Sequence, residues 1–196
     1  MLLNECIESC IDSDYPFFAD DKEVSGVIAS MQEGRLESVP VLHDGKIIAM
    51  LTLLDLLPIL QSGKKNKQRL WDLKLEPSGS IGRHEHLFDV FSRIRSFPGD
   101  LIPVSEEDGK YAGVIRKATL LEKVATVFHL SGEGMTLELD IPAFELKLSE
   151  VIATLEKNDA TVLSFGMYRP VADGESMVVT FRVQTCLLYT SPSPRD

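Results

Sequence analysis

The stretch Ala49-Met50-Leu51-Thr52-Leu53-Leu54-Asp55 marks the point where an apolar strand gives way to a helix. It follows Asp44-Gly45, and such a pair between two apolar runs is a strong signal for a β-hairpin. We therefore expect paired strands at residues 39–42 and 47–51. A helix then begins after Thr52 and continues to about Gln61.

Thr52 and Asp55 have two interpretations at this junction. In the simpler one, Thr52 is the N-cap of the helix and Asp55 lies in its first turn. In the other, the junction binds a ligand, because the start of a helix offers unpaired N–H groups and a partial positive charge to a phosphate. The Thr52 hydroxyl then contacts the phosphate, and the Asp55 carboxylate accepts hydrogen bonds from a ribose.

The same arrangement returns further along the chain. Asp108-Gly109 repeats Asp44-Gly45, and Gly113 repeats Ala49 at the same offset. Each hairpin also follows an apolar stripe with helical spacing. The stripes are Val24, Val27, Ile28 and Met31 in the first copy and Leu87, Val90, Phe91 and Ile94 in the second. The sequence therefore predicts an internal repeat of two similar units that pack together.

These residues resemble a known family. Ser38-Val39-Pro40-Val41-Leu42, Asp44-Gly45 and residues 49–55 are similar to a CBS domain, named after cystathionine β-synthase, and the second copy resembles its tandem partner. The resemblance covers roughly residues 12–128. It implies a pseudo-symmetric module of two β-α-β-β-α repeats with two clefts. In this family the clefts often bind AMP, ADP, ATP or S-adenosylmethionine.

The resemblance also implies ligand-binding positions. The hydroxyl and the acid of the strand-to-helix turn contact phosphate and ribose, which carries over to Thr52 and Asp55. The adenine pocket is then lined by residues that precede and form the first strands of the copy. These are Phe17, Phe18, Val39 and Pro40.

The second copy departs from the family pattern at this junction. Arg116 stands at the position of Thr52, and Thr119 stands at the position of Asp55. The second ribose-binding acid is therefore missing. Arg116 and Lys117 are candidates to contact a phosphate held at Thr52, with Thr119 beside them, because arginine offers a planar fork to phosphate. The alternative is that both cations are solvated residues at a helix start.

Composition narrows the function classes. The chain has 196 residues and a formal net charge of −10, which argues against nucleic acid as a sequence-independent partner. No apolar run is long enough to suggest a transmembrane helix, and the N-terminus has no signal-peptide pattern. We expect a cytosolic protein with no membrane partner. One basic run, residues 64–69, is interpreted as a solvated linker, or else as an anion-attracting edge beside the cleft.

Residues 131–185 change pattern. Strand-like alternation at 135–141 precedes an amphipathic helix and two further strands, at 160–167 and 177–183. This β-α-β-β order resembles the first part of a ferredoxin-like ACT domain, which needs one more helix and strand. No ligand residue carries over, because Pro142-Ala143-Phe144 replaces the family's glycine-rich turn. We interpret this region as a dimerisation module, with amino-acid binding as the alternative.

The final residues, 186–196, fit nothing before them. They resemble the translation of an adapter used in sequencing libraries, so we expect them to be read-through and the natural protein to continue differently after Thr185. The expected organisation is α/β (α+β) overall. A first CBS domain occupies residues 1–66, a second 67–130, and a partial ACT-like domain 131–185.

Catalytic and metal sites are not expected. The four histidines are scattered, no nucleophile has a base at a recognisable spacing, and no glycine-rich phosphate loop is present. Cys6 and Cys10 share a helix face and are assigned to packing, because two thiols do not complete a zinc site. No cofactor is required by this interpretation.

Two hypotheses remain from the sequence. The first is a homodimeric sensor that binds an adenine nucleotide or related adenosyl ligand at the Thr52/Asp55 cleft and signals to an unknown protein target. The second is an interaction scaffold without a ligand, in which both residues serve only as helix caps. Asp55 discriminates between them, because its removal abolishes nucleotide binding only under the first.

Overall fold

The computed structural model describes residues 7–61, 67–142, 144–145, 147–170 and 176–185. The chain divides into two compact units, residues 1–122 and 123–196. Within the described residues, helices and small sheets are mixed, and each of the three sheets has three strands. The α+β class predicted from the sequence is confirmed.

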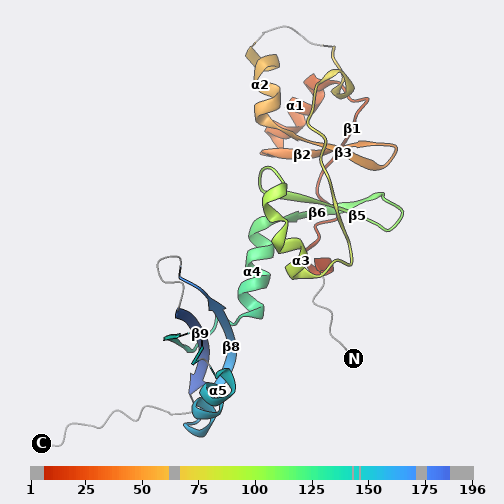
Figure 1. The fold of residues 1–196 in the computed structure, drawn as a ribbon. Helices are drawn as coiled ribbons and strands as arrows, with labels where there is room; N and C mark the ends of the chain where they lie inside the picture. The colour runs from red at the N-terminus through yellow and green to blue at the C-terminus, as the bar shows by residue number, and fades with distance from the viewer. Residues whose placement is uncertain (1–6, 62–66, 143, 146, 171–175, 186–196) are drawn as a thin grey trace, which may run out of the picture. The chain divides into compact units, whose positions relative to one another are not determined.

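The first repeat of unit 1 is a three-stranded sheet with two helices (Figure 1). Its elements are β1 (Phe18–Ala19), α1 (Val24–Glu33), β2 (Ser38–His43), β3 (Lys46–Thr52) and α2 (Leu53–Gln61). The strand order is β1-β2-β3, with β1 parallel and β3 antiparallel to β2. The apolar stripe of α1 is buried as predicted, since Val24, Val27 and Met31 lie in the core.

The second repeat has the same order of elements. It comprises β4 (Ile81–Gly82), α3 (Leu87–Ser92), a 3-10 turn (Ile94–Ser96), β5 (Leu101–Ser105), β6 (Tyr111–Arg116) and α4 (Lys117–Val127). Its sheet order is β4-β5-β6, again with one parallel and one antiparallel pair. A further 3-10 turn, Leu70–Asp72, precedes it.

Both predicted hairpins are confirmed, and their turns use positive backbone dihedrals. In the first turn φ is 49° at Asp44 and 76° at Gly45. In the second, φ is 81° at Gly109. Positive φ at the central residues matches the twist of the flanking strands, which is why Asp-Gly and Asn-Gly pairs favour tight hairpins.

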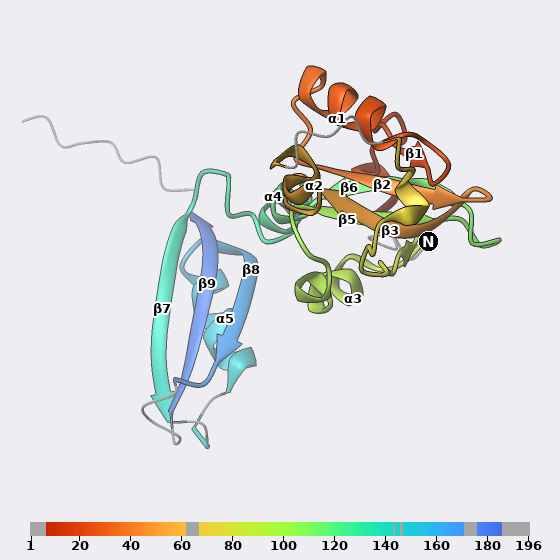
Figure 2. The ribbon, with the colours of Figure 1, turned by 90° about the horizontal axis from the view of Figure 1, so that it is seen from above.

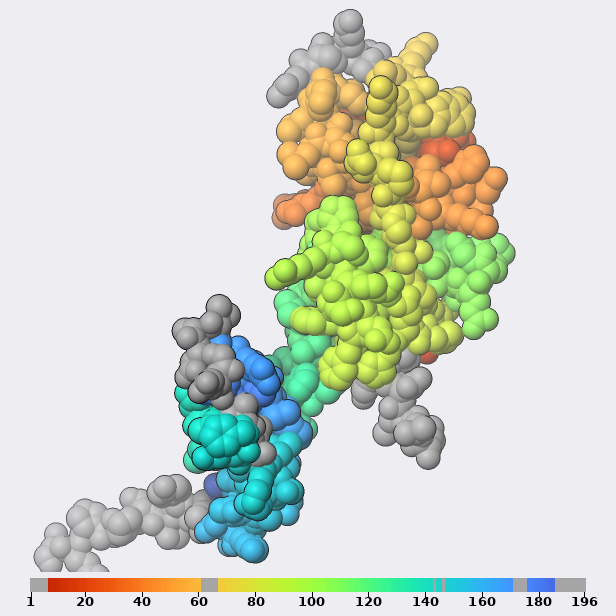
Figure 3. Space-filling view, in the orientation of Figure 1, coloured from red at the N-terminus to blue at the C-terminus, as the bar shows by residue number. Residues whose placement is uncertain are grey.

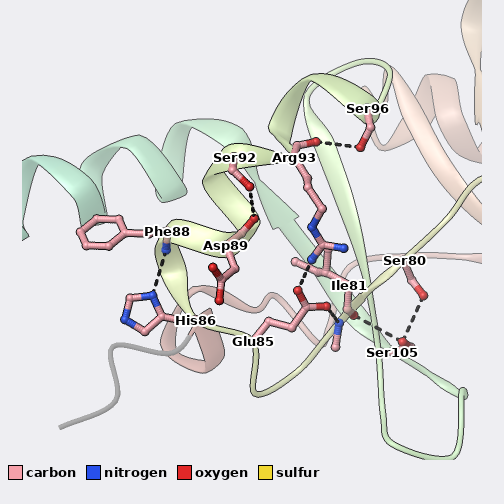
Figure 4. Close-up of polar contacts among 11 residues, drawn as sticks. Ser80, Ile81, Glu85, His86, Phe88, Asp89, Ser92, Arg93, Ser96 and Ser105 are labelled. Carbon is pink, nitrogen blue, oxygen red and sulfur yellow. Dashed lines mark hydrogen bonds and ion pairs between the residues drawn. The ribbon is translucent and has the colours of Figure 1, made fainter. Parts of the chain in front are cut away.

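Helix α3 is shorter than the sequence stripe suggests, and polar contacts hold its start (Figure 4). The His86 side chain, at the N-cap, accepts a hydrogen bond from the Phe88 N–H at 3.2 Å. The Glu85 carboxylate accepts from the Gly82 N–H at 2.6 Å and also pairs with Arg93. These contacts tie the helix to β4.

The two repeats exchange their lead-in segments. Asp12, ahead of the first repeat, forms an antiparallel bridge with Val114 of β6, with N···O distances of 2.8 and 3.1 Å. Pro77, ahead of the second repeat, bridges to Ala49 of β3. Figures 1 and 3 show the yellow segment before the second repeat lying across the surface of the first. The segment before each repeat therefore pairs with a hairpin strand of the other repeat.

Gly113 shows why this exchange restricts the sequence. Its φ is 142°, and a Cβ built there would lie 2.6 Å from the carbonyl oxygen of Asp12. An L-residue disfavours this φ, and no Cβ fits at that distance. Glycine is needed where the lead-in segment crosses β6.

The described part of unit 2 contains one antiparallel sheet. Its elements are β7 (Met135–Pro142), α5 (Leu148–Lys157), β8 (Ala160–Tyr168) and β9 (Ser176–Thr185), in the strand order β7-β9-β8 (Figure 2). The β-α-β-β order predicted for this region is present. Helix α5 packs its apolar side on Val179, Phe181 and Val183 of the central strand.

Arg182 points to the other face of that central strand, because strand side chains alternate. Its guanidinium donates hydrogen bonds to the carbonyl oxygens of His129, Gly132 and Gly134 at 3.0–3.3 Å. It also donates to the Thr136 hydroxyl at 3.0 Å. One side chain thus fixes the loop that leads into β7.

Within the described residues, no helix is long and apolar enough to cross a membrane. In the same part of the chain, no cluster of three or more His, Cys, Asp or Glu is arranged to hold a metal ion. Cys10 is buried, whereas Cys6 and residues 186–196 lie outside the described residues.

The basic run at residues 64–69 also lies partly outside the described residues. Its last residue, Arg69, donates to the Asp21 carbonyl at 3.1 Å and lies 5.0 Å from the centre of the Trp71 ring.

Candidate functional site

A cavity of about 660 Å³ lies in unit 1 and is lined by residues of both repeats. The first repeat contributes residues 34–38 and 52–54, and the second contributes residues 99–101 and Arg116. Tyr15, from the segment before β1, completes the wall. The cavity therefore lies where β3 passes into α2, the junction singled out by the sequence.

Thr52 and Asp55 form a reciprocal cap at that junction. The Asp55 Oδ2 accepts from the Thr52 N–H at 2.8 Å and from its hydroxyl at 2.7 Å. The Asp55 N–H lies 3.4 Å from the Thr52 Oγ. This geometry is a capping box, with an aspartate in the place usually taken by glutamate or glutamine. The predicted N-cap is confirmed. Thr52 lines the cavity, and Asp55 is exposed one turn further along.

Asp55 retains capacity for a ligand. Both of its short contacts use Oδ2, so among the described residues Oδ1 has no hydrogen-bond donor. A carboxylate offers about four lone-pair sites in total. The capping role and a ribose-binding role therefore do not exclude each other.

Arg116 and Tyr15 form the opposite wall. The guanidinium carbon of Arg116 lies 5.3 Å from the centre of the Tyr15 ring, within the range of a cation–π contact. The Tyr15 hydroxyl donates to the Ser38 carbonyl oxygen at 2.8 Å. Burial raises the pKa of Tyr15, and the carboxylates of Asp12, Asp100 and Glu37 add to this, while Arg116 opposes it. Tyr15 thus holds Arg116 beside the first repeat.

Glu37 and Asp100 occupy matching positions on the two sides of the cavity. The Leu53 N–H, at the start of α2, donates to the Glu37 carbonyl at 3.1 Å. The Lys117 N–H, at the start of α4, donates to the Asp100 carbonyl at 2.8 Å. Each acid is therefore fixed at the mouth of one strand–helix junction.

The structure brings together three of the nine residues proposed from the sequence, because Asp55 is hydrogen-bonded to Thr52. Thr52 and Arg116 line the cavity. The Lys117 ammonium instead donates to the Phe97 carbonyl at 2.7 Å, and Thr119 is partly buried outside the lining. Val39 and Pro40 are buried within β2.

Phe17 and Phe18 lie elsewhere. Phe17 packs edge-on against Tyr111 with ring centres 5.4 Å apart and lines a separate cavity of about 400 Å³. Phe18 lines a third cavity, of about 430 Å³, beside α1. The reason is the pairing of β1, which runs parallel to β2 with Phe18 opposite Val41. This register places Tyr15, three positions earlier, level with Ser38 at the main cavity.

Sequence reasoning missed Tyr15, Arg35, Glu37 and Asp100. A signal existed for the two acids, because Glu37 precedes Pro40 by the same number of positions as Asp100 precedes Pro103. Arg35 adopts a positive φ of 50° just after α1, which turns the chain toward β2 at the cavity wall. No local pattern marks that conformation, because it depends on how the helix packs on its sheet.

Comparison with known proteins comes from structure alone. No protein-family model matches the sequence, and no curated protein matches it. A CBS domain pair/ACT domain protein from Thermotoga maritima has a TM-score of 0.54 and 13% identity, over 62% of this chain and 97% of that chain.

Two other similar structures were solved with a bound nucleotide. CBSX2, a CBS-pair protein of Arabidopsis thaliana, was solved in complex with AMP; its TM-score is 0.51 and its identity 17%, over 62% of this chain and 97% of that chain. The CBS domain of a bacterial CNNM/CorC family Mg²⁺ transporter was solved with ATP. Its TM-score is 0.54 and its identity 15%, over 61% of this chain and 87% of that chain. This chain therefore has the fold of a CBS domain pair.

Proposed function

We propose that the protein is a cytoplasmic, non-catalytic regulatory sensor whose CBS pair binds an adenosine ligand in the 660 Å³ cavity. One observation carries the proposal: Thr52, at the start of α2, and Arg116, from the equivalent position of the other repeat, line the same cavity. A hydroxyl at a helix start and a guanidinium together suit an anionic group.

The roles of the individual residues follow from their contacts. The anionic tail lies at the start of α2, where the Thr52 hydroxyl turns from Asp55 to donate to it, and Arg116 faces it from the other repeat. Asp55 uses its unoccupied Oδ1 to accept from the ribose hydroxyls. Tyr15 is the aromatic residue of the wall, which suits an adenine ring. The neighbours solved with AMP and ATP support an adenine nucleotide as the general class of ligand.

Signalling requires a second state. Because the cavity takes residues from both repeats, a bound ligand changes the free energy with which they pack. A ligand shifts an equilibrium only by the difference between its affinities for the two states. We propose that the shift is passed to unit 2, acting as an ACT-like dimerisation module, and to a protein target of the homodimer.

A scaffold without ligand is the second candidate, and the capping box favours it. Thr52 and Asp55 already satisfy one another, so both residues have a complete structural role without a ligand. Under this alternative the cavity is a surface depression between two packed repeats.

Thermal unfolding of the full chain separates the two candidates. AMP, ADP, ATP and S-adenosylmethionine are each added at saturating concentration. A ligand at about 100 times its Kd adds about 2.7 kcal/mol, which raises the Tm of a protein of this size by about 5–10 °C. The shift should vanish in Asp55→Ala and persist in the control Thr119→Ala, which alters the equivalent position outside the cavity. A folded protein whose Tm responds to none of the four compounds favours the scaffold.

A further inference from the structure

Among the described residues, the cavity is lined by four charged ones, two of each sign. Arg35 and Glu37 come from the first repeat, and Asp100 and Arg116 come from the second. Among the described residues none of the four has an ion-pair partner, although Arg116 contacts the Tyr15 ring. Unpaired charges of both signs around one cavity favour a ligand that itself carries both signs.

We infer that Glu37 and Asp100 are specificity-determining residues, which make the cavity select an adenosine ligand with a cationic group over a nucleoside polyphosphate. The inference rests on the proposed function and names its ligand class. Among adenosine compounds, S-adenosylmethionine has the required chemistry: a sulfonium and an ammonium for the two carboxylates, and one carboxylate for the arginines.

Position supports this selection. The Glu37 and Asp100 backbones are fixed by the first N–H of α2 and of α4, and both residues line the cavity, one from each repeat. Their charges reach the interior of the wall, because both carboxylates help to raise the pKa of the buried Tyr15. A triphosphate in this space would bring its negative charges close to both acids. Their repulsion would offset the attraction between the triphosphate and the two arginines.

The size of the effect is bounded by solvent. Glu37 and Asp100 are exposed, so water and salt screen their fields. A preference of about tenfold is therefore expected, with AMP between S-adenosylmethionine and ATP because it carries fewer negative charges than ATP.

Isothermal titration of the full chain at about 0.05 M salt, where screening is weak, tests the inference. S-adenosylmethionine should bind at least about tenfold more tightly than ATP. In the double variant Glu37→Gln/Asp100→Asn, the ratio of the Kd for ATP to the Kd for S-adenosylmethionine should fall by about tenfold. ATP should bind more tightly than to the wild type, and S-adenosylmethionine more weakly. Glu107→Gln, an exposed acid of the β5–β6 turn outside the cavity lining, is the control and should leave both constants unchanged.

The outcomes distinguish a failure of the charge selection from a failure of the proposed adenosine site. If the wild-type chain binds ATP or AMP more tightly than S-adenosylmethionine, and Asp55→Ala abolishes that binding, the charge selection is wrong and the adenosine site stands. If none of the three compounds binds, the proposed function fails and the inference fails with it. Because the wild-type comparison needs no variant, it decides the matter even if the double variant does not fold.

Discussion

The two repeats of unit 1 share a backbone plan but differ in chemistry at the same point. At the first strand–helix junction, Thr52 and Asp55 form a reciprocal cap. At the second, Arg116 and Thr119 stand in their places, and Arg116 turns to the Tyr15 ring. The buried positions around both junctions remain apolar. The buried apolar residues stabilise the shared fold, so the exposed junction residues can differ and can serve in binding.

The strongest test of the shared plan is the core residue that follows each junction. Leu56 and Leu120 occupy equivalent positions in the two repeats, and both have 0% exposed surface. Leu56→Ala and Leu120→Ala should each lower the free energy of unfolding by about 3–4 kcal/mol, since each leaves a cavity. Urea denaturation measures both. A cost below about 1 kcal/mol in only one variant would show that the two junctions are not packed alike.

The positions where the lead-in segments cross the sheets, Gly113 and Ala49, should respond differently to substitution. Gly113→Ala should cost about 2–3 kcal/mol, because the new Cβ meets the Asp12 carbonyl and the φ of 142° disfavours alanine. The reverse change at the matching position, Ala49→Gly, should cost about 1 kcal/mol at most. Equal costs would contradict the close crossing at β6. Denaturation by urea, with a check that the slope is unchanged, compares them.

The caps should differ by a smaller amount. Asp55→Ala removes two hydrogen bonds of the capping box and should cost about 1 kcal/mol without ligand. Thr119→Ala should cost less than about 0.5 kcal/mol, since no cap of this kind forms there. Thermal unfolding of both variants is sufficient. A larger loss in Thr119→Ala would reveal a structural role at the second junction.

Tyr15 and Tyr111 give a comparison that depends on pH. Burial raises the pKa of Tyr15 and of Tyr111 above the ordinary value of 10. The unfolded chain therefore loses these protons first, so their contribution is complete below about pH 10 and falls as the pH rises above it. At pH 7, Tyr15→Phe should cost about 1 kcal/mol for the bond to Ser38.

Tyr111→Phe is the matched control. Its hydroxyl is buried and, within the described residues, has no hydrogen-bond partner, so its removal should be neutral or stabilising at pH 7. Between about pH 10 and 11.5, the free energy of unfolding should decline less steeply in both variants than in the wild type. An unchanged slope in both would contradict the assignment of the raised pKa values.

Local patterns predicted the elements well. The Asp-Gly turns located both hairpins, and the apolar stripe of α1 placed its buried face. The spacing of Thr52 and Asp55 identified a cap that the structure contains. Each of these depends on neighbours within a few positions, and local sequence therefore carries the information.

The cavity wall was harder to predict, because it is assembled by pairings between distant segments. Phe17 and Phe18 were expected there, but the parallel register of β1 brings Tyr15 to the cavity instead. The arrival of Asp100 and Arg116 depends on how one repeat packs on the other. Helix α3 also ends at Ser92, before its apolar stripe does, and Arg93 just beyond it pairs with Glu85.

The bridge between Asp12 and Val114 has a consequence for the order of events during synthesis. Most of unit 1 separates these partners in the sequence, so the N-terminal segment leaves the ribosome long before its strand exists. At a translation rate of roughly 5–20 residues per second, it waits about 5–20 s for that strand. Docking of this segment is therefore among the last steps in the folding of unit 1. If translation pauses before Val114, proteases should still cleave the nascent chain near Asp12.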